Sequence, residues 1–182
     1  VTLPEGMTIN PGQADGLGVC TDEQAGVETG KMNCPDASRV GTVEVVTPLL
    51  DDLMRGGIYL GDQLSDDPES GEMFRMFLEI ANEERGLSLV IPGKFIVDPD
   101  TGQITTLVED APQQPFESMK LHFKGGPRGL LATPPTCGTY EVQSRLTAWG
   151  IDEPVELTNE IVIDKGPGGG PCEAGDPDEP AD

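Results

Sequence analysis

The sequence predicts an all-β protein, an antiparallel β-sandwich of the immunoglobulin-like or a related kind with about eight or nine strands. The chain has 24 Gly and 17 Pro among 182 residues, close to double their average usage of roughly 12%. Without a Gly-X-Y period, such an excess indicates many turns. Between residues 41 and 163, short runs alternate apolar and polar side chains, as half-buried strands do. Four widely spaced Cys favour disulfides.

The expected elements follow in order along the chain. Residues 1–39 are interrupted by Pro and Gly and are expected to be mostly irregular. After them, nine runs have the period of two that is typical of strands: 41–47, 56–61, 72–81, 86–91, 94–97, 103–110, 118–124, 139–149 and 155–163. Pro92 and Gly93 predict a kink or bulge between the fourth and fifth runs.

Residues 72–81 (EMFRMFLEIA) fit two patterns. A strand explains the alternation of Phe74, Met76, Leu78 and Ile80. A helix explains the stripe formed by Met73, Met76, Phe77 and Ile80. We favour the strand, because every neighbouring segment has β character and natural sequences are locally consistent.

Alternation also predicts which side chains face the core. In the run 118–124, Met119, Leu121 and Phe123 point one way, and Lys120, His122 and Lys124 point to solvent. In the last two runs, the side chains expected to point inward are Tyr140, Val142, Leu146, Ala148, Val155, Leu157, Ile161 and Ile163.

The cysteines are Cys20, Cys34, Cys137 and Cys172, with no C-x-x-C pair and a single His beside them, so a zinc site would need unusual spacing. Of the three possible connectivities we expect Cys20–Cys34 and Cys137–Cys172, because each closes a segment with little strand character of its own. Chain entropy puts these two links at about 3 and 4 kcal/mol. The alternative is four reduced, buried thiols in a cytosolic protein.

The chain is strongly acidic, with 33 Asp and Glu against 11 Lys and Arg and a formal net charge of −22. Such a surface repels phosphate backbones and anionic lipids, so we expect no nucleic acid and no membrane-surface partner. No secretory signal and no apolar run long enough to span a membrane is visible. We expect a secreted or cell-surface chain whose export signal has been removed or lies upstream.

The predicted organisation is one β-sandwich domain over residues 1–172, in which the first disulfide holds the irregular segment 1–39. From Gly166 onward Gly, Pro and acidic residues dominate. Residues 173–182 are therefore expected to be an acidic, disordered tail or linker. Such an end indicates that the domain is tethered to further domains.

Calcium is the most plausible metal. Asp98, Asp100 and Glu109 fall at positions 1, 3 and 12 of an EF-hand-like spacing. Gly102 and Gln103, however, stand where that loop needs a ligand and a glycine, so the segment DPDTG is better explained as a hairpin turn without a metal. A second acidic cluster, no more specific, consists of Asp62, Asp66, Asp67 and Glu69.

No spacing indicates catalysis, and we expect a protein that is not an enzyme. His122 is the one candidate general base, but Lys120 and Lys124 flank it on the solvent face. No pair of acids is placed as a glycosidase requires. The segment GGPRG at 125–129 lacks the Lys and the following helix of a phosphate-binding loop.

Carbohydrate binding usually needs exposed aromatic rings, and the chain has one Trp, two Tyr and five Phe. Trp149 and Tyr59 are the plausible platforms. We expect both to pack in the core instead.

A series of different short motifs stands in order along the chain. They are Leu3–Gly6, Asn10–Pro11, Cys20, Cys34–Pro35, Ser38, Gly41, Thr47–Leu50, Gly57–Leu60, Asp98–Thr106, Pro112–Phe116, Gly125–Leu131, Thr133–Tyr140, Trp149 and Cys172. This set resembles modules of large secreted bacterial cell-surface proteins. The likeness spans about residues 1–172, is most specific over 98–140, and is poor over 64–85. The resemblance implies an exported β-sandwich, often repeated in tandem, and supplies no catalytic residues.

We therefore expect a non-catalytic structural or adhesive module of an exported bacterial surface protein, with proteins or glycans at the cell surface as partners. The alternative is a calcium-assisted or carbohydrate-binding accessory module of a larger secreted protein.

Overall fold

The computed structural model describes residues 1–10, 16–67, 70–126, 129–151, 153–166 and 169–172. Within these residues the protein is all-β, as predicted. The strands are β1 (Thr8–Ile9), β2 (Arg39–Val46), β3 (Met54–Gln63), β4 (Glu72–Asn82), β5 (Leu87–Val97), β6 (Ile104–Leu107), β7 (Ser118–Phe123), β8 (Leu131–Ala132), β9 (Gly138–Leu146) and β10 (Val155–Ile163). The expected tail, 173–182, lies outside the described residues.

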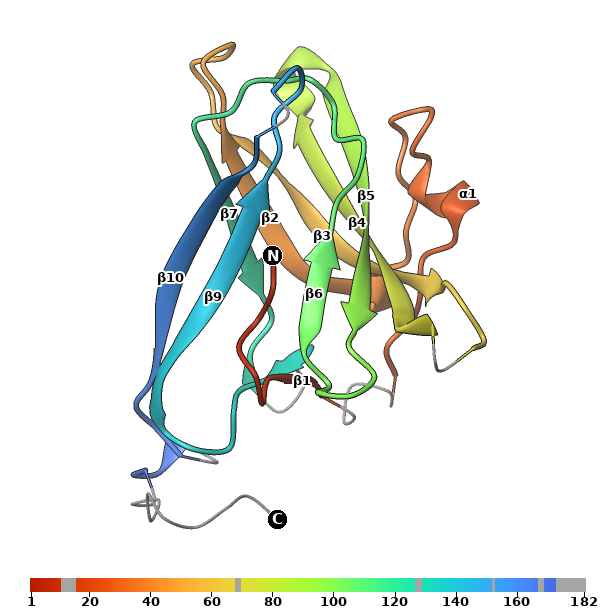
Figure 1. The fold of residues 1–182 in the computed structure, drawn as a ribbon. Helices are drawn as coiled ribbons and strands as arrows, with labels where there is room; N and C mark the ends of the chain where they lie inside the picture. Colours follow the sequence, from red (N-terminus) through yellow and green to blue (C-terminus); the bar gives the residue numbers. More distant parts are fainter. Residues whose placement is uncertain (11–15, 68–69, 127–128, 152, 167–168, 173–182) are drawn as a thin grey trace.

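Six strands form one curled antiparallel sheet in the order β6-β5-β4-β3-β2-β7 (Figure 1). The ambiguous segment 72–81 is the strand β4, as predicted, and it pairs with β5 along its length. The expected runs 86–91 and 94–97 form the single strand β5, and the bulge predicted between them is not present, because the register with β4 is continuous through Pro92 and Gly93. The strand β6 pairs with β5 only from Lys94 onward. One side of β5 therefore has no partner strand at Pro92, and a proline there does not end the strand.

The inner face of this sheet carries the main core. Period-2 alternation turns Val43 and Val45 of β2 to this face, and the same alternation applies in β3, β4 and β5. The buried members of the core are Val40, Val43, Val45, Ile58, Leu60, Met76, Leu78, Ile80, Ile91, Phe95, Ile104 and Leu130. Met119 and Phe123 of β7 pack against its edge.

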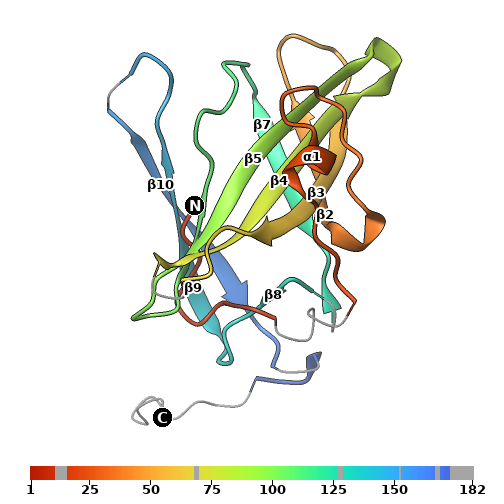
Figure 2. The ribbon, with the colours of Figure 1, turned by 90° about the vertical axis from the view of Figure 1, so that its right-hand side faces the viewer.

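The outer face of the sheet is covered by a disulfide-closed N-terminal segment, residues 16–35, which we call the flap. It contains the helix α1 (Asp22–Ala25), which lies against β3 and β4 in Figure 2. Cys20 and Ala25 are fully buried there with Phe77 and Val90. Two 3-10 turns, Asp36–Ser38 and Glu83–Arg85, are also present, and no helix in the described ranges is long and apolar enough to cross a membrane.

Residues 1–9 connect the sheet to the rest of the fold. Thr2 bridges Thr105 of β6 on one side and Gln143 of β9 on the other. Its N–H donates to the Gln143 carbonyl at 2.7 Å, and the Gln143 N–H donates back at 3.0 Å. Further along, β1 pairs with β8, which places Ile9 and Leu131 against the inner core.

The strands β9 and β10 form a separate two-stranded hairpin, in front of the sheet in Figure 1. Tyr140, Val142 and Ser144 are half-buried and alternate with exposed residues, so their face turns toward the body of the molecule. The prediction that this whole face would be inward is wrong. Leu146, Ala148, Val155, Leu157 and Ile161 are exposed, and in the described residues no β9 or β10 side chain packs on the inner core.

Candidate functional site

The flap is closed on itself by a disulfide and is joined to the sheet by a backbone hydrogen bond. Cys20 bonds to Cys34, with Cα atoms 5.1 Å apart, and the Cys20 N–H donates to the Leu60 carbonyl of β3 at 2.8 Å. The next residue, Thr21, begins α1 with a capping box shared with Gln24. This motif, T-D-E-Q, was visible in the sequence, but we expected no helix in this segment.

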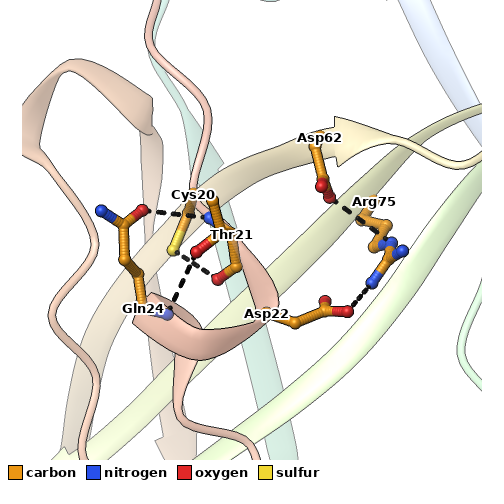
Figure 3. Close-up of polar contacts among 6 residues, drawn as sticks. All are labelled: Cys20, Thr21, Asp22, Gln24, Asp62 and Arg75. Carbon is orange, nitrogen blue, oxygen red and sulfur yellow. Dashed lines mark hydrogen bonds and ion pairs between the residues drawn. The ribbon is translucent and has the colours of Figure 1, made fainter.

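Charged side chains reinforce the same junction (Figure 3). Arg75 of β4 forms an ion pair through Nη1 with Asp22 of α1, and its Nε lies 3.6 Å from Oδ1 of Asp62 on β3. We call these three residues the clasp. Hydrogen bonding to Asp22 is the largest of the effects that raise the pKa of Arg75, so its charge is present at every accessible pH. The clasp orders the flap and presents no nucleophile.

The described members of the acidic cluster expected between residues 62 and 69 form no group placed to hold a metal ion. Asp62 belongs to the clasp, and Glu69 lies outside the described residues. The Asp67 backbone is held in a turn by Ser65 and Ser70. Across the described ranges, no group of three or more His, Cys, Asp or Glu side chains is placed to hold a metal ion.

The calcium candidates Asp98 and Asp100 form a hairpin turn. The Asp98 carboxylate accepts hydrogen bonds from the N–H groups of Thr101 at 2.8 Å and Asp100 at 3.0 Å. These bonds, above all that from Thr101, hold the pKa of Asp98 below its ordinary value. Gly102 has φ +71°, which closes the turn. Glu109 is not part of this group, because it pairs with Lys94 at 3.3 Å.

The predicted solvent exposure of His122 is confirmed. With Arg39 and Lys124 it lines a shallow surface depression at the end of β7. Lys124 Nζ donates to the Arg39 carbonyl, and within the described chain none of these three side chains forms an ion pair. In GGPRG, Pro127 and Arg128 lie outside the described residues, and Gly126 and Gly129 are joined by a backbone hydrogen bond. The depression therefore gathers three basic side chains beside one acidic residue, Asp36.

The two aromatic candidates differ. Tyr59 packs under the flap as expected, and its hydroxyl lies 3.5 Å from Glu79. Burial, followed by the charge of Glu79, raises the pKa of Tyr59. The prediction that Trp149 packs in the core is wrong. Its side chain is 56% exposed at the hairpin tip, with the indole N–H donated to the Ala111 carbonyl at 2.8 Å.

The second disulfide, Cys137–Cys172, closes the hairpin at the end opposite Trp149, with Cα atoms 5.7 Å apart. Both predicted pairings are therefore present. Comparisons with protein-family models, curated proteins and solved structures found no match. The resemblance of the sequence motifs to surface-protein modules consequently rests on those motifs alone.

Proposed function

We propose that this chain is a non-catalytic structural or adhesive module of an exported bacterial surface protein. In this proposal its fold is an immunoglobulin-like or related β-sandwich, with the β9–β10 hairpin as the second layer over the inner face of the sheet. The observation that carries the proposal is the placement of the two disulfides. One closes the flap on the outer face, and the other closes the base of the hairpin.

Both disulfides stabilise segments that the sheet itself holds weakly. The flap lies outside the sheet, and the hairpin is joined to it mainly through Thr2. Such covalent links persist in an oxidising environment outside the cell and are rare in the cytosol. The acidic candidates are also engaged structurally, with Asp98 in a turn, Asp62 in the clasp and Glu109 on Lys94. These roles favour a module that holds its shape over one that turns over a substrate.

The role as an exported module is tested by folding under two redox conditions. The protein would be produced in the bacterial periplasm and in a reducing cytoplasm, and both samples unfolded in urea. We expect the reduced sample to be less stable by at least about 3 kcal/mol, the stabilisation of the smaller disulfide loop alone. Equal stability of the reduced and oxidised samples would contradict the proposal.

The two-layer arrangement is tested by nuclear Overhauser effects. If the hairpin packs as a second layer in solution, the half-buried Val142 gains contacts that the described residues do not show here, from its methyl groups to side chains of the inner core such as Phe123 and Leu130. An absence of such contacts, with the six-stranded sheet intact, would show that the hairpin projects from the sheet without packing on it.

A second candidate, a glycan-binding module, is favoured by Trp149. An exposed indole fixed by a backbone hydrogen bond is a preformed stacking surface for a sugar ring. Binding to a glycan array would be compared for the wild type and for Trp149→Ala, with Leu87→Ala as a control at another exposed apolar position. Binding that is lost only in Trp149→Ala would support this function, and no binding by the wild type would exclude it for the glycans tested.

A further inference from the structure

Two strands of the fold have an edge without a partner. In the described residues, β7 pairs with β2 alone and β10 pairs with β9 alone. The free edges present rows of backbone N–H and C=O groups, which are a template for pairing with another strand. The solvent-facing side chains of the two edges have opposite charge.

The β7 edge is basic. Lys120 and His122 point to solvent from β7, and Lys124 follows directly after the strand. Across the sheet, Arg55 lies 3.6 Å from Glu44, and Glu44 stands opposite Lys120 in the β2–β7 register. The charge of the side chains in this row therefore alternates, from Arg55 on β3 through Glu44 on β2 to Lys120 on β7. An acidic residue on a strand added outside β7 would continue the alternation.

The β10 edge is acidic, with the same spacing. Glu156 and Glu160 lie four residues apart on its solvent face, as Lys120 and Lys124 do at β7. Glu156 stands opposite Arg145 of β9, whereas Glu160 stands directly opposite Glu141. Like charges at opposed positions destabilise a sheet, so a cation supplied from the open side of β10 would offset this repulsion.

The apolar faces match at two of three positions in the same register, the exception being Leu121, which falls opposite Asn159. When β7 and β10 run antiparallel with Lys120 opposite Glu160, Lys124 falls opposite Glu156. The alternate residues then place Met119 opposite Ile161 and Phe123 opposite Leu157. Ile161 and Leu157 are 36% and 48% exposed in this structure, so a paired strand would cover apolar surface that the hairpin leaves open.

From these edges we propose that β7 of one copy of this chain pairs antiparallel with β10 of a second copy. The contact is head-to-tail, and each added copy leaves one free β7 and one free β10, which generates an open chain of modules. The proposal goes beyond the structural role above and does not depend on it, because it concerns only the two strand edges. The net charge of −22 opposes association of two copies. The short-range Lys–Glu pairs must therefore outweigh that repulsion at about 0.15 M salt, where screening acts over roughly 8 Å.

The test is sedimentation velocity of the oxidised protein from micromolar to submillimolar concentration in that salt. Two charge-reversed variants, K120E/K124E and E156K/E160K, each give two edges of the same sign. The wild type is expected to show an average mass that rises with concentration. The association constant of each variant should be lower than that of the wild type by roughly tenfold or more. The control variants K31E/R85E and E5K/E28K change the net charge equally at exposed positions away from both edges, and they should associate as the wild type does.

Mixing the two edge variants decides the pairing. In the mixture, the acidic β7 edge of K120E/K124E can pair with the basic β10 edge of E156K/E160K, so association should recover. A single chain that carries all four reversals again has edges of opposite charge and should also associate. Far-UV circular dichroism and thermal unfolding would establish that every variant is folded. A wild type that stays monomeric throughout would overturn the proposal, as would an association that the reversals leave unchanged or that mixing fails to restore.

Discussion

Asp22 in the first turn of α1 and Arg75 in the middle of β4 form an ion pair that joins the disulfide-closed flap to the sheet. The Arg75 side chain is 28% exposed and the Asp22 side chain 62% exposed. Arg75 also approaches Asp62, whose Oδ1 is buried without a hydrogen-bond partner in the described residues. The two carboxylates therefore depend on Arg75 to different degrees.

Replacing the two partners of this pair should have unequal effects. Asp22→Asn removes one largely exposed charge and should cost about 0.5–1 kcal/mol. Arg75→Met keeps an apolar side chain of similar length but leaves the buried Asp62 oxygen without its cation, and should cost about 2 kcal/mol. Urea unfolding of both single variants and the double variant measures these values. Equal costs for the two single variants would contradict a role of Asp62 in the clasp.

The close approach of β3 and β4 leads to a second prediction. A Cβ atom on Gly56 would lie 1.6 Å from the carbonyl oxygen of Glu79, and backbone in the middle of a sheet cannot move aside cheaply. Gly56→Ala should therefore destabilise the protein by about 3 kcal/mol or more. Gly125→Ala is the matched control, because nothing lies within 4 Å of the added carbon. Similar midpoints of thermal unfolding for the two variants would refute this account.

The strands could be predicted from the sequence because alternation is a property of each strand by itself. Thus 41–47 and 118–124 correspond to β2 and β7. The partner of an apolar face is not encoded in that pattern. Val155 and Leu157 alternate as core residues do, yet they lie on a hairpin whose face is left largely exposed. Alternation therefore identified the apolar face of β10 but could not show that no other element packs against it.

The disulfides and the turn at Asp98 were also predictable, since both depend on residues close in sequence or few in number. The clasp was not, because Asp22, Asp62 and Arg75 meet only after the flap folds over β3 and β4. Any of the 33 acidic residues could pair with Arg75 as far as the sequence shows. The exposure of Trp149 was missed for a related reason. The strand that was expected to reach it ends at Leu146, which leaves the indole in the turn.

The turn at Asp98 predicts a dependence of stability on pH. The folded pKa of Asp98 is lowered from an ordinary value near 3.9 by hydrogen bonds to its charged form. Its stabilising contribution is therefore present in full above that pH and is lost as the pH falls through the lower folded value. Asp98→Asn, which can accept the same bonds without a charge, should be less stable than the wild type at pH 7. The difference should shrink below about pH 4.

Urea unfolding of both proteins at neutral and acidic pH measures this difference, and other carboxylates cancel because they are common to both chains. A gap that widens on acidification would contradict the sign. The same two proteins also test calcium. We expect equal thermal midpoints in millimolar calcium and in chelator, because the Asp98 carboxylate is engaged in the turn. A calcium-dependent rise in the wild type that disappears in Asp98→Asn would instead identify a cation site.

The attachment of the hairpin through Thr2 gives the last prediction. Thr2→Pro removes the N–H that donates to the Gln143 carbonyl, whereas Thr2→Val keeps that bond and loses only the 3.1 Å contact between the Thr2 and Thr105 hydroxyl oxygens. The proline variant should be less stable by about 1–3 kcal/mol. Its amide hydrogens in β9 and β10 should exchange faster, while those in β4 and β5 remain protected, because only the hairpin depends on this link. Exchange that accelerates equally in both regions would mean that the hairpin and the sheet unfold as one cooperative unit.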